Sequence, residues 1–305
     1  MVPRASLIAW SARAPWPSED RVEQDLIISR LLVEVADDSL LSKELAFRGG
    51  TCLHKLHLEE PLRYSEDLDF VRTDQQPLLG EISDALRSIA DRIGLREHRR
   101  TFPSKNSDTA TIWFEGNAES GAATIRVKIE TNVAESVPHR DHVFIPYAVE
   151  SPWWSGSAEV RTFALEEILA TKVRALCQRR KGRDLFDLWI GLNRPGVNVD
   201  EIAAALCHYM QDRVYSYPQL VGHLEIKLGD PDFAADLHGL VRSPPRDYDI
   251  PIALELVRRR IGLKLRNVPD SQIDELSDDE RGIAKGALVA ARSGAAATLS
   301  RWPMS

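Results

Sequence analysis

The spacing of apolar residues along the first half of the chain indicates an alternation of helices and strands. Apolar positions three or four residues apart predict a helix, and alternating ones predict a strand. On this basis we predict helices over 18–35, 40–45 and 77–93, and strands over 95–102, 109–114 and 123–131. Residues 1–17 follow neither period, so we expect an irregular arm that docks through Trp10 and Trp16.

Beyond residue 162 the apolar spacing is helical. We predict helices over 165–179, from 184 onwards, and over 199–210, 218–227, 233–241, 250–265 and 279–293. The segment 152–156, Pro-Trp-Trp-Ser-Gly, is typical of a linker with aromatic anchors. We therefore expect a mixed α/β (α+β) domain over 1–162, followed by an α-helical domain over 163–305.

One stretch, residues 44–71, combines a glycine turn with a pair of aspartates: ELAFRGGTCLHKLHLEEPLRYSEDLDFV. Its pattern predicts a strand, a turn at Gly49 and Gly50, a helix opened by Thr51, and a second strand. Glycines allow positive φ and close backbone approach, so their N–H groups can cradle a phosphate. The start of the following helix also favours an anion.

The aspartates close this stretch. Asp67 and Asp69 are two residues apart on the second predicted strand, so their side chains point to the same side, while Leu68 and Phe70 face the core. Two carboxylates held this close repel each other unless a cation lies between them. Mg²⁺, shared with substrate phosphates, is the usual cation, although an Asp-x-Asp pair alone is also common on protein surfaces.

A third carboxylate is a candidate for the same site. In the strand predicted over 123–131, apolar residues occupy one face, and Arg126, Lys128 and Glu130 occupy the other. Glu130 reaches the aspartates only if this strand lies beside theirs. The alternative is an ordinary solvated strand face.

The helical half carries further charged candidates. Lys172 and Asp187 fall on successive predicted helices that can pack as a hairpin, so they form either a site or a surface ion pair. Two basic clusters are candidate RNA contacts because lysine and arginine track phosphates: Arg179, Arg180 and Lys181, and Arg258, Arg259 and Arg260. The net charge of −7 means that any such contact must come from a local patch, and a solvated face is the alternative.

Gly-Gly-Thr followed by Asp-Leu-Asp resembles the signature of the polymerase-β-like nucleotidyltransferases. The longer string, with Arg63, Tyr64, Ser65 and Glu66 before the aspartates, resembles motif I of the AbiEii/AbiGii toxin family, which includes the mycobacterial MenT toxins. The Lys172 helix followed by Arg-Asp-Leu-Phe-Asp-Leu at 183–188 resembles the second block of that family. The resemblance is strong over 45–71 and extends over about 1–190.

The resemblance implies a polymerase-β-like domain with a mixed sheet, followed by a helical domain. It also implies a Mg²⁺-dependent enzyme that transfers NMP from an NTP. The implied metal ligands are Asp67, Asp69 and Glu130. The implied nucleotide site comprises Gly49, Gly50, Thr51, Ser65, Asp184, Lys172 and Asp187, with Lys172 and Asp187 counted with the two aspartates as catalytic.

As a toxin of a toxin–antitoxin system, the protein is expected to have a cognate antitoxin encoded nearby. The expected acceptor is an RNA, specifically a tRNA 3′ end, whose extension blocks translation. Transfer to a protein hydroxyl shares the same phosphate chemistry, and a non-catalytic nucleotide-binding module remains a further alternative.

Cysteine usage and hydropathy bear on the compartment. The three cysteines are scattered without metal-ligand spacing, which favours a reducing cytoplasm. No apolar run reaches membrane-spanning length, and the first residues do not show the features of a signal peptide. We therefore expect a cytoplasmic protein without a membrane partner.

Overall fold

A computed structural model describes residues 2–58, 60–74, 79–105, 107–121, 123–133, 135–210, 216–241 and 245–267. Backbone contacts divide the chain into two units. Unit 1 comprises 1–164 and 239–243, and unit 2 comprises 165–238 and 244–305. The expected division into a nucleotidyltransferase domain over 1–162 and a helical domain over 163–305 stays a prediction.

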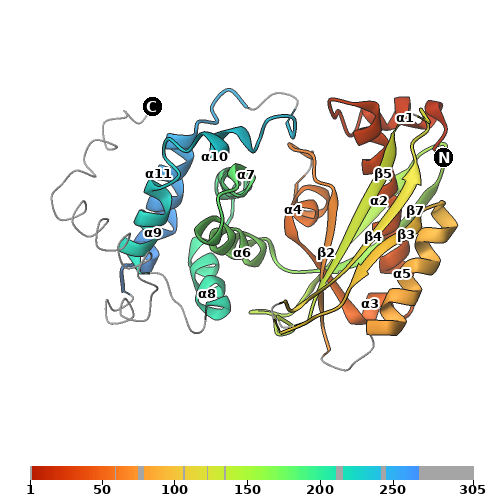
Figure 1. The fold of residues 1–305 in the computed structure, drawn as a ribbon. Coiled ribbons are helices and arrows are strands. Elements are labelled where there is room, and N and C mark those ends of the chain that lie inside the picture. Colours follow the sequence, from red (N-terminus) through yellow and green to blue (C-terminus); the bar gives the residue numbers. More distant parts are fainter. Residues whose placement is uncertain are drawn as a thin grey trace. The chain divides into compact units, whose positions relative to one another are not determined.

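Unit 1 is built on a seven-stranded mixed sheet in the order β3-β4-β5-β2-β1-β7-β6, as Figure 1 shows. The expected mixed sheet is therefore confirmed. The β2–β5 and β1–β7 pairs are parallel, and the other pairs are antiparallel. The strands are β1 Leu45–Arg48, β2 Asp67–Arg72, β3 Arg96–Thr101, β4 Thr109–Asn117, β5 Thr124–Asn132, β6 Val143–Glu150 and β7 Ser155–Thr162.

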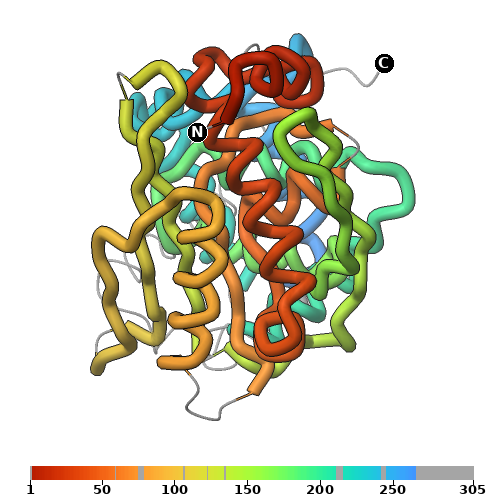
Figure 2. The backbone as a smooth tube through the Cα atoms, turned by 90° about the vertical axis from the view of Figure 1, so that its right-hand side faces the viewer, coloured from red at the N-terminus to blue at the C-terminus, as the bar shows by residue number. Residues whose placement is uncertain are grey.

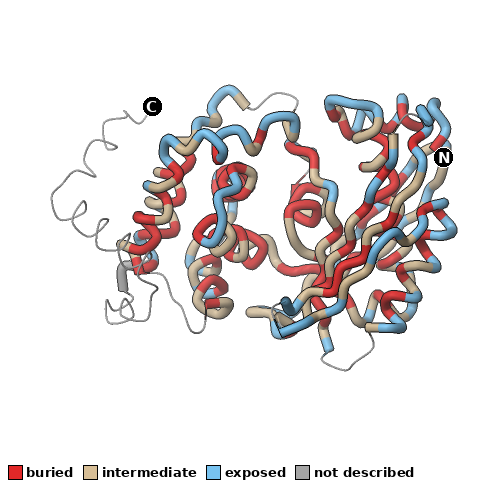
Figure 3. The backbone as a smooth tube through the Cα atoms, in the orientation of Figure 1, coloured by how far each residue is buried: buried red, intermediate tan, exposed pale blue. Residues whose placement is uncertain are grey.

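The helices of unit 1 cover mainly one face of this sheet. They are α1 Arg4–Ser11, α2 Glu19–Asp37, α3 Leu41–Glu44, α4 Gly49–Cys52 with the π-helix η1 Leu53–His57, and α5 Leu79–Ile93. Figure 2 shows α2 running along the sheet with α5 beside it. Alternation in β5 directs Ile125, Val127 and Ile129 into this core, where each is at most 2% exposed. In Figure 3 buried positions accordingly recur along the central strands, between positions coloured as intermediate or exposed.

The N-terminal residues differ from the expected irregular arm, because 4–11 form α1. This helix has no side-chain cap, so tertiary packing stabilises it more than its own sequence does. Trp10 and Trp16 are buried as expected. The Trp10 indole N–H donates to Asp25 Oδ1 at 2.9 Å.

The segment expected to be a linker is the turn of a β-hairpin. Strands β6 and β7 pair antiparallel on either side of residues 151–154. The prediction of a linker was wrong because β7, Ser-Gly-Ser-Ala-Glu-Val-Arg-Thr, buries only Val160 and Thr162 and lacks an apolar alternation. Thr162 anchors β7 to β1, since its hydroxyl donates to the Phe47 carbonyl at 2.7 Å.

Unit 2 is helical in its described residues. It contains α6 Leu165–Gln178, α7 Gly182–Leu192, α8 Val199–Tyr209, α9 Tyr217–Glu225, α10 Pro231–Ala235, α11 Ile250–Arg260 and the 3₁₀-helix η2 Gly262–Asn267. The helix predicted over 233–241 was wrong, because α10 ends at Ala235 and Gly239 adopts a φ of 75°. The helix predicted over 279–293 lies outside the described residues. Within the described ranges, no helix has the length and apolar character needed to cross a membrane.

Candidate active site

The glycine turn joins β1 to α4 directly against β2. Helix α4 begins at Gly49, two residues before the expected Thr51, with Arg48 in the capping position. Gly49 has a φ of 85°, which favours glycine. A Cβ at this position would also overlap the Asp69 carboxylate. The turn therefore brings its backbone close to the aspartates, as phosphate binding beside a metal requires.

Thr51 and Ser65 tie this turn to β2. The Thr51 hydroxyl is buried and donates to the Asp67 carbonyl at 2.5 Å, and it lies 2.8 Å from the Ser65 hydroxyl. Gly50 packs so closely on Arg63 that an added Cβ would overlap its guanidinium. The local role of Thr51 is thus to hold the turn in place, while Ser65, only partly buried, remains available at its edge.

The structure brings the three candidate carboxylates together. In the parallel β2–β5 pair, Asp69 lies opposite Glu130, and Asp67 lies opposite Lys128. Leu68 and Phe70 point into the core, with exposures of 0% and 3%, so both aspartates point to the other face. Glu130 therefore does not belong to an isolated solvated strand. It belongs to a carboxylate cluster on two neighbouring strands.

This cluster concentrates negative charge. Burial raises the pKa of the Asp69 carboxyl above its usual range, and the neighbouring Glu130 carboxylate raises it further, against the opposing effect of Arg48. The Lys128 ammonium lies 3.0 Å from Asp67 Oδ2 and 3.4 Å from Glu130 Oε1. Burial alone would lower the pKa of Lys128, but these carboxylates raise it. Lys128 therefore acts as the counter-cation of the cluster.

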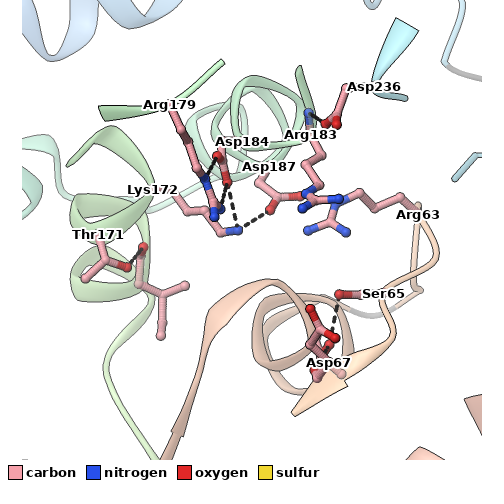
Figure 4. A network of polar contacts seen from close by, with 12 residues as sticks. Arg63, Ser65, Asp67, Thr171, Lys172, Arg179, Arg183, Asp184, Asp187 and Asp236 are labelled. Atoms are coloured by element: carbon pink, nitrogen blue, oxygen red, sulfur yellow. Dashed lines mark hydrogen bonds and ion pairs between the residues drawn. The ribbon is translucent and has the colours of Figure 1, made fainter. Parts of the chain in front are cut away.

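A second charged cluster lies within unit 2, between α6 and α7. Figure 4 shows the Lys172 ammonium between two carboxylates, 2.8 Å from Asp187 Oδ2 and 3.3 Å from Asp184 Oδ1. Lys172 is 6% exposed and both aspartates are 0% exposed. This is a buried ion network and not the surface pair that the sequence left open. Close packing of the two helices, in which Gly191 meets Leu169, encloses it.

Arg179 completes this network. Its Nε and Nη2 atoms donate to the two oxygens of Asp184 at 2.7 and 2.9 Å. Burial alone would raise the pKa of Asp184, but Lys172 and then Arg179 lower it below its usual range. Both buried carboxylates thus lie beside Lys172, and Asp184 also binds Arg179.

Comparison with known proteins identifies the family. Residues 30–258 match the family model described as nucleotidyl transferase AbiEii toxin of type IV toxin–antitoxin systems. The chain belongs to this AbiEii family. It is therefore a nucleotidyltransferase of a toxin family, and membership implies a cognate antitoxin. No curated protein matches the sequence.

Solved structures resemble the AbiEii chain at low sequence identity. MenT4, a nucleotidyltransferase toxin from Mycobacterium tuberculosis, aligns with a TM-score of 0.62 and 17% identity over 93% of this chain and 98% of its own. Two proteins from Helicobacter pylori also align. A putative nucleotidyltransferase has a TM-score of 0.46 and 19% identity over 82% and 97% of the two chains. JHP933 has a TM-score of 0.45 and 18% identity over 92% and 99%. The likeness to MenT4 shows a shared fold.

The carboxylate cluster has the chemistry of a Mg²⁺ site. Carboxylate oxygens are the ligands that Mg²⁺ prefers. Burial and then the Glu130 carboxylate raise the pKa of Asp69, and a nearby cation would favour its ionised form. Among the described residues, no group of three His, Cys, Asp or Glu side chains is already arranged around a metal position. The Lys128 ammonium lies between Asp67 and Glu130 and contacts both carboxylates. Three carboxylates on two neighbouring strands are a donor set that fits Mg²⁺, with which the Lys128 ammonium would compete, and metal binding by them stays a prediction.

Replacing Lys128 by methionine is therefore expected to strengthen metal binding. Two unit charges about 4 Å apart interact by roughly 1 kcal/mol in water and about 4 kcal/mol near a protein surface. Because the substitution removes the repulsion between Lys128 and the metal ion, the dissociation constant for Mn²⁺ should fall at least about fivefold. Electron paramagnetic resonance of Mn²⁺ measures it. Arg126→Met is the matched control, because Arg126 lies on the same strand face but pairs with Glu115. Weaker binding in Lys128→Met would show that the lysine orients the carboxylates instead.

The candidate RNA contacts all have partners within unit 2. Arg179 binds Asp184, Arg180 lies 3.6 Å from Asp230, and Lys181 lies 3.3 Å from Asp236. In the second cluster, Arg258 and Arg259 both bind Glu255, and Arg260 donates to the Leu192 carbonyl. RNA binding by these residues stays a prediction. Reversing the charge of all three α11 arginines would also disrupt these pairs, so Arg180, whose side chain is 66% exposed, is a better probe.

Sequence reasoning missed three residues of these clusters. The sequence placed Lys128 on the polar face of a strand without giving it a role. Arg48 and Arg63 were noted only as part of the stretch 44–71. Arg48 pairs with Glu135 beside the glycine turn, and Arg63 is 3% exposed against Gly50. A signal for Lys128 was present, because it lies two residues before Glu130 and so shares its face.

Proposed function

We propose that this AbiEii nucleotidyltransferase transfers a nucleoside monophosphate from an NTP to the 3′ end of an RNA, specifically a tRNA. The modified 3′ end no longer accepts an amino acid, and translation stops. The observation that carries the proposal is the arrangement of Asp67, Asp69 and Glu130 on adjacent strands, directly against the glycine turn. This arrangement suits a triphosphate whose charge must be neutralised where it reacts.

Each group has a role in this reaction. Asp67, Asp69 and Glu130 would hold Mg²⁺, which lowers the pKa of the attacking hydroxyl and neutralises the triphosphate. The N–H groups of Gly49 and Gly50 and the Ser65 hydroxyl bind phosphate oxygens. The 3′ oxygen bonds to the α-phosphorus, the bond from that phosphorus to the bridging oxygen breaks, and pyrophosphate leaves. The proton of the hydroxyl passes to a carboxylate of the cluster or to water.

The cluster in unit 2 supplies the remaining phosphate contact in this proposal. Lys172 is a compact cation whose position is fixed by Asp184 and Asp187. A fixed ammonium stabilises negative charge without reorganising during the reaction. We assign it to the β- and γ-phosphates of the NTP, with the two aspartates as positioning residues.

An RNA 3′ end is the acceptor that best fits this chemistry. It presents a 2′,3′-diol whose hydroxyls are strong candidates for metal activation. Transfer to a protein hydroxyl would use the same phosphate groups and differ only in the acceptor. Within the proposal the enzyme acts in the cytoplasm, where tRNA and NTPs are available.

Labelled NTP incubated with total RNA and total protein tests the acceptor. The label is expected in RNA of tRNA size, and periodate-treated RNA, which has lost its 3′ diol, is expected to remain unlabelled. Each of the four NTPs is supplied separately, and Asp69→Asn serves as the inactive control. Equal labelling of periodate-treated and intact RNA, or label only in protein, would reject the RNA 3′ end and favour protein modification.

A further inference from the structure

A partly exposed tryptophan lies on the carboxylate face of the unit 1 sheet. Trp113 in β4 stands between Ile112 and Phe114, which are 3% and 0% exposed and point to the opposite face. That opposite face is the one that α5 covers. Arg99 of β3 lies over the indole, with its guanidinium carbon 4.9 Å from the ring centroid. Core packing therefore does not account for this ring.

The strand register places the ring in line with the carboxylate cluster. Asp67 lies opposite Lys128, Lys128 opposite Trp113, and Trp113 opposite Arg99, so one row of side chains crosses four strands. Neighbouring strands are about 4.8 Å apart, which puts the Trp113 backbone roughly 10 Å from that of Asp67. This span corresponds to about three stacked nucleotides at ~3.4 Å each.

Charge on this part of the face suits a phosphate backbone. Residues directly opposite each other in a ladder share a face, which assigns four basic side chains to it: Arg96, Arg99, Arg126 and Lys128. Glu115 lies among them and pairs with Arg126 at 2.9 Å, and Lys128 contacts Asp67 and Glu130 of the carboxylate cluster. Basic groups interspersed with an aromatic ring are the arrangement by which proteins bind single-stranded nucleic acid.

The position of the glycine turn indicates that the surface around Trp113 receives the acceptor RNA and not the NTP. In the sheet order, the turn follows β1 on one side of β2, and Trp113 lies beyond β5 on the other side. In-line phosphoryl transfer needs the attacking and leaving oxygens on opposite sides of the phosphorus. With pyrophosphate leaving on the β1 side, the acceptor strand approaches across β4 and β5.

We propose that Trp113 and Arg99 form a stacking platform for an unpaired base near the 3′ end of the acceptor RNA. The ligand is a single-stranded ribonucleotide segment, with its base on the indole and its phosphates along the basic side chains. This inference rests on the proposed transfer to RNA. It assigns to unit 1 a share of RNA recognition that the sequence placed only in the helical half.

Fluorescence anisotropy of a labelled, single-stranded RNA octamer on the full chain tests the platform. Trp113→Leu is expected to raise the RNA dissociation constant about fivefold to 150-fold, the range for losing one base–aromatic stack. Trp113→Phe keeps an aromatic face and is expected to bind within about threefold of wild type. NTP affinity should be unchanged in both variants, which a folding defect would not allow.

Phe144→Leu is the matched control. Phe144 is an exposed aromatic residue under Arg161, but it lies on β6 at the far edge of the sheet. Its removal should leave RNA affinity unchanged. Arg99→Gln provides a second variant. Because Arg99 is exposed on the edge strand β3, its replacement should not disturb folding, and it is expected to weaken RNA binding several-fold.

Wild-type RNA affinity in both Trp113→Leu and Arg99→Gln would overturn the platform, as would equal losses in Trp113→Phe and Trp113→Leu. If such variants still label RNA normally, the proposed function stands without the platform. If RNA binds through Trp113 but only protein becomes labelled, the platform stands and the proposed acceptor is wrong.

Discussion

Asp69→Asn is expected to reduce pyrophosphate release and RNA labelling by about a thousandfold, while the protein remains at least as stable as wild type. The loss follows because the carboxylate helps to hold the metal and neutralise the triphosphate, a contribution worth about a hundredfold to a thousandfold for a single preorganised group. Stability is retained because burial, and then the neighbouring Glu130 carboxylate, make the charge of Asp69 unfavourable in the fold. Asparagine keeps the shape and removes the repulsion.

Pyrophosphate release with each NTP and thermal unfolding measure the two effects. Asp91→Asn is the control, because Asp91 is an exposed aspartate on α5, which lies against the opposite face of the sheet. It should change neither quantity. Retention of more than about a tenth of wild-type activity in Asp69→Asn would mean that this carboxylate is not a metal ligand. A marked loss of stability would mean that its charge supports the fold.

Lys172→Met is expected to impair both folding and activity. It leaves Asp184 and Asp187, both fully buried, with Arg179 as the remaining cation that contacts Asp184. Breaking a buried ion pair by removing one partner typically costs about 3–5 kcal/mol of unfolding free energy. Loss of a phosphate contact would in addition lower transfer by about tenfold to a thousandfold.

The double variant Lys172→Met with Asp187→Asn separates these effects. It removes one charge of each sign, so the net charge of the network equals that of wild type, and most of the lost unfolding free energy should return. Transfer should not return, because the ammonium is still missing. Urea unfolding and transfer kinetics are measured for both variants, with Lys264→Met as a control, because Lys264 is a lysine of unit 2 that pairs with Asp200 and has a side chain that is 44% exposed. Full activity in the stable double variant would assign Lys172 to the fold alone.

Some features of these two clusters could be predicted from the sequence, whereas others could be seen only in the structure. The sequence identified the turn and the aspartates, because each depends on neighbours within a few residues. Glycines at 49 and 50 indicate a turn, and a two-residue spacing puts Asp67 and Asp69 on one side of a strand. The same two-residue period places Glu130 on the face of β5 opposite to its apolar residues.

Other features depended on which strands pair. The alternation of residues in β5 does not indicate that β5 lies beside β2. That pairing joins segments some sixty residues apart and depends on the packing of the whole sheet. The β6–β7 hairpin was missed because β7 is nearly devoid of apolar residues and is held by its neighbours. Helix α1 was missed because it is short and uncapped, and the buried Trp10 anchors it.

The sequence by itself thus determined the glycine turn, the aspartate pair and the face on which Glu130 lies, since local geometry fixes all three. Tertiary structure alone decided that Lys128 lies among the carboxylates, that the Lys172 pair is buried, and that Trp113 shares the carboxylate face in one row with Asp67. The physical reason is that contacts across a sheet or between helices are set by long-range packing, which no period of two or 3.6 residues records.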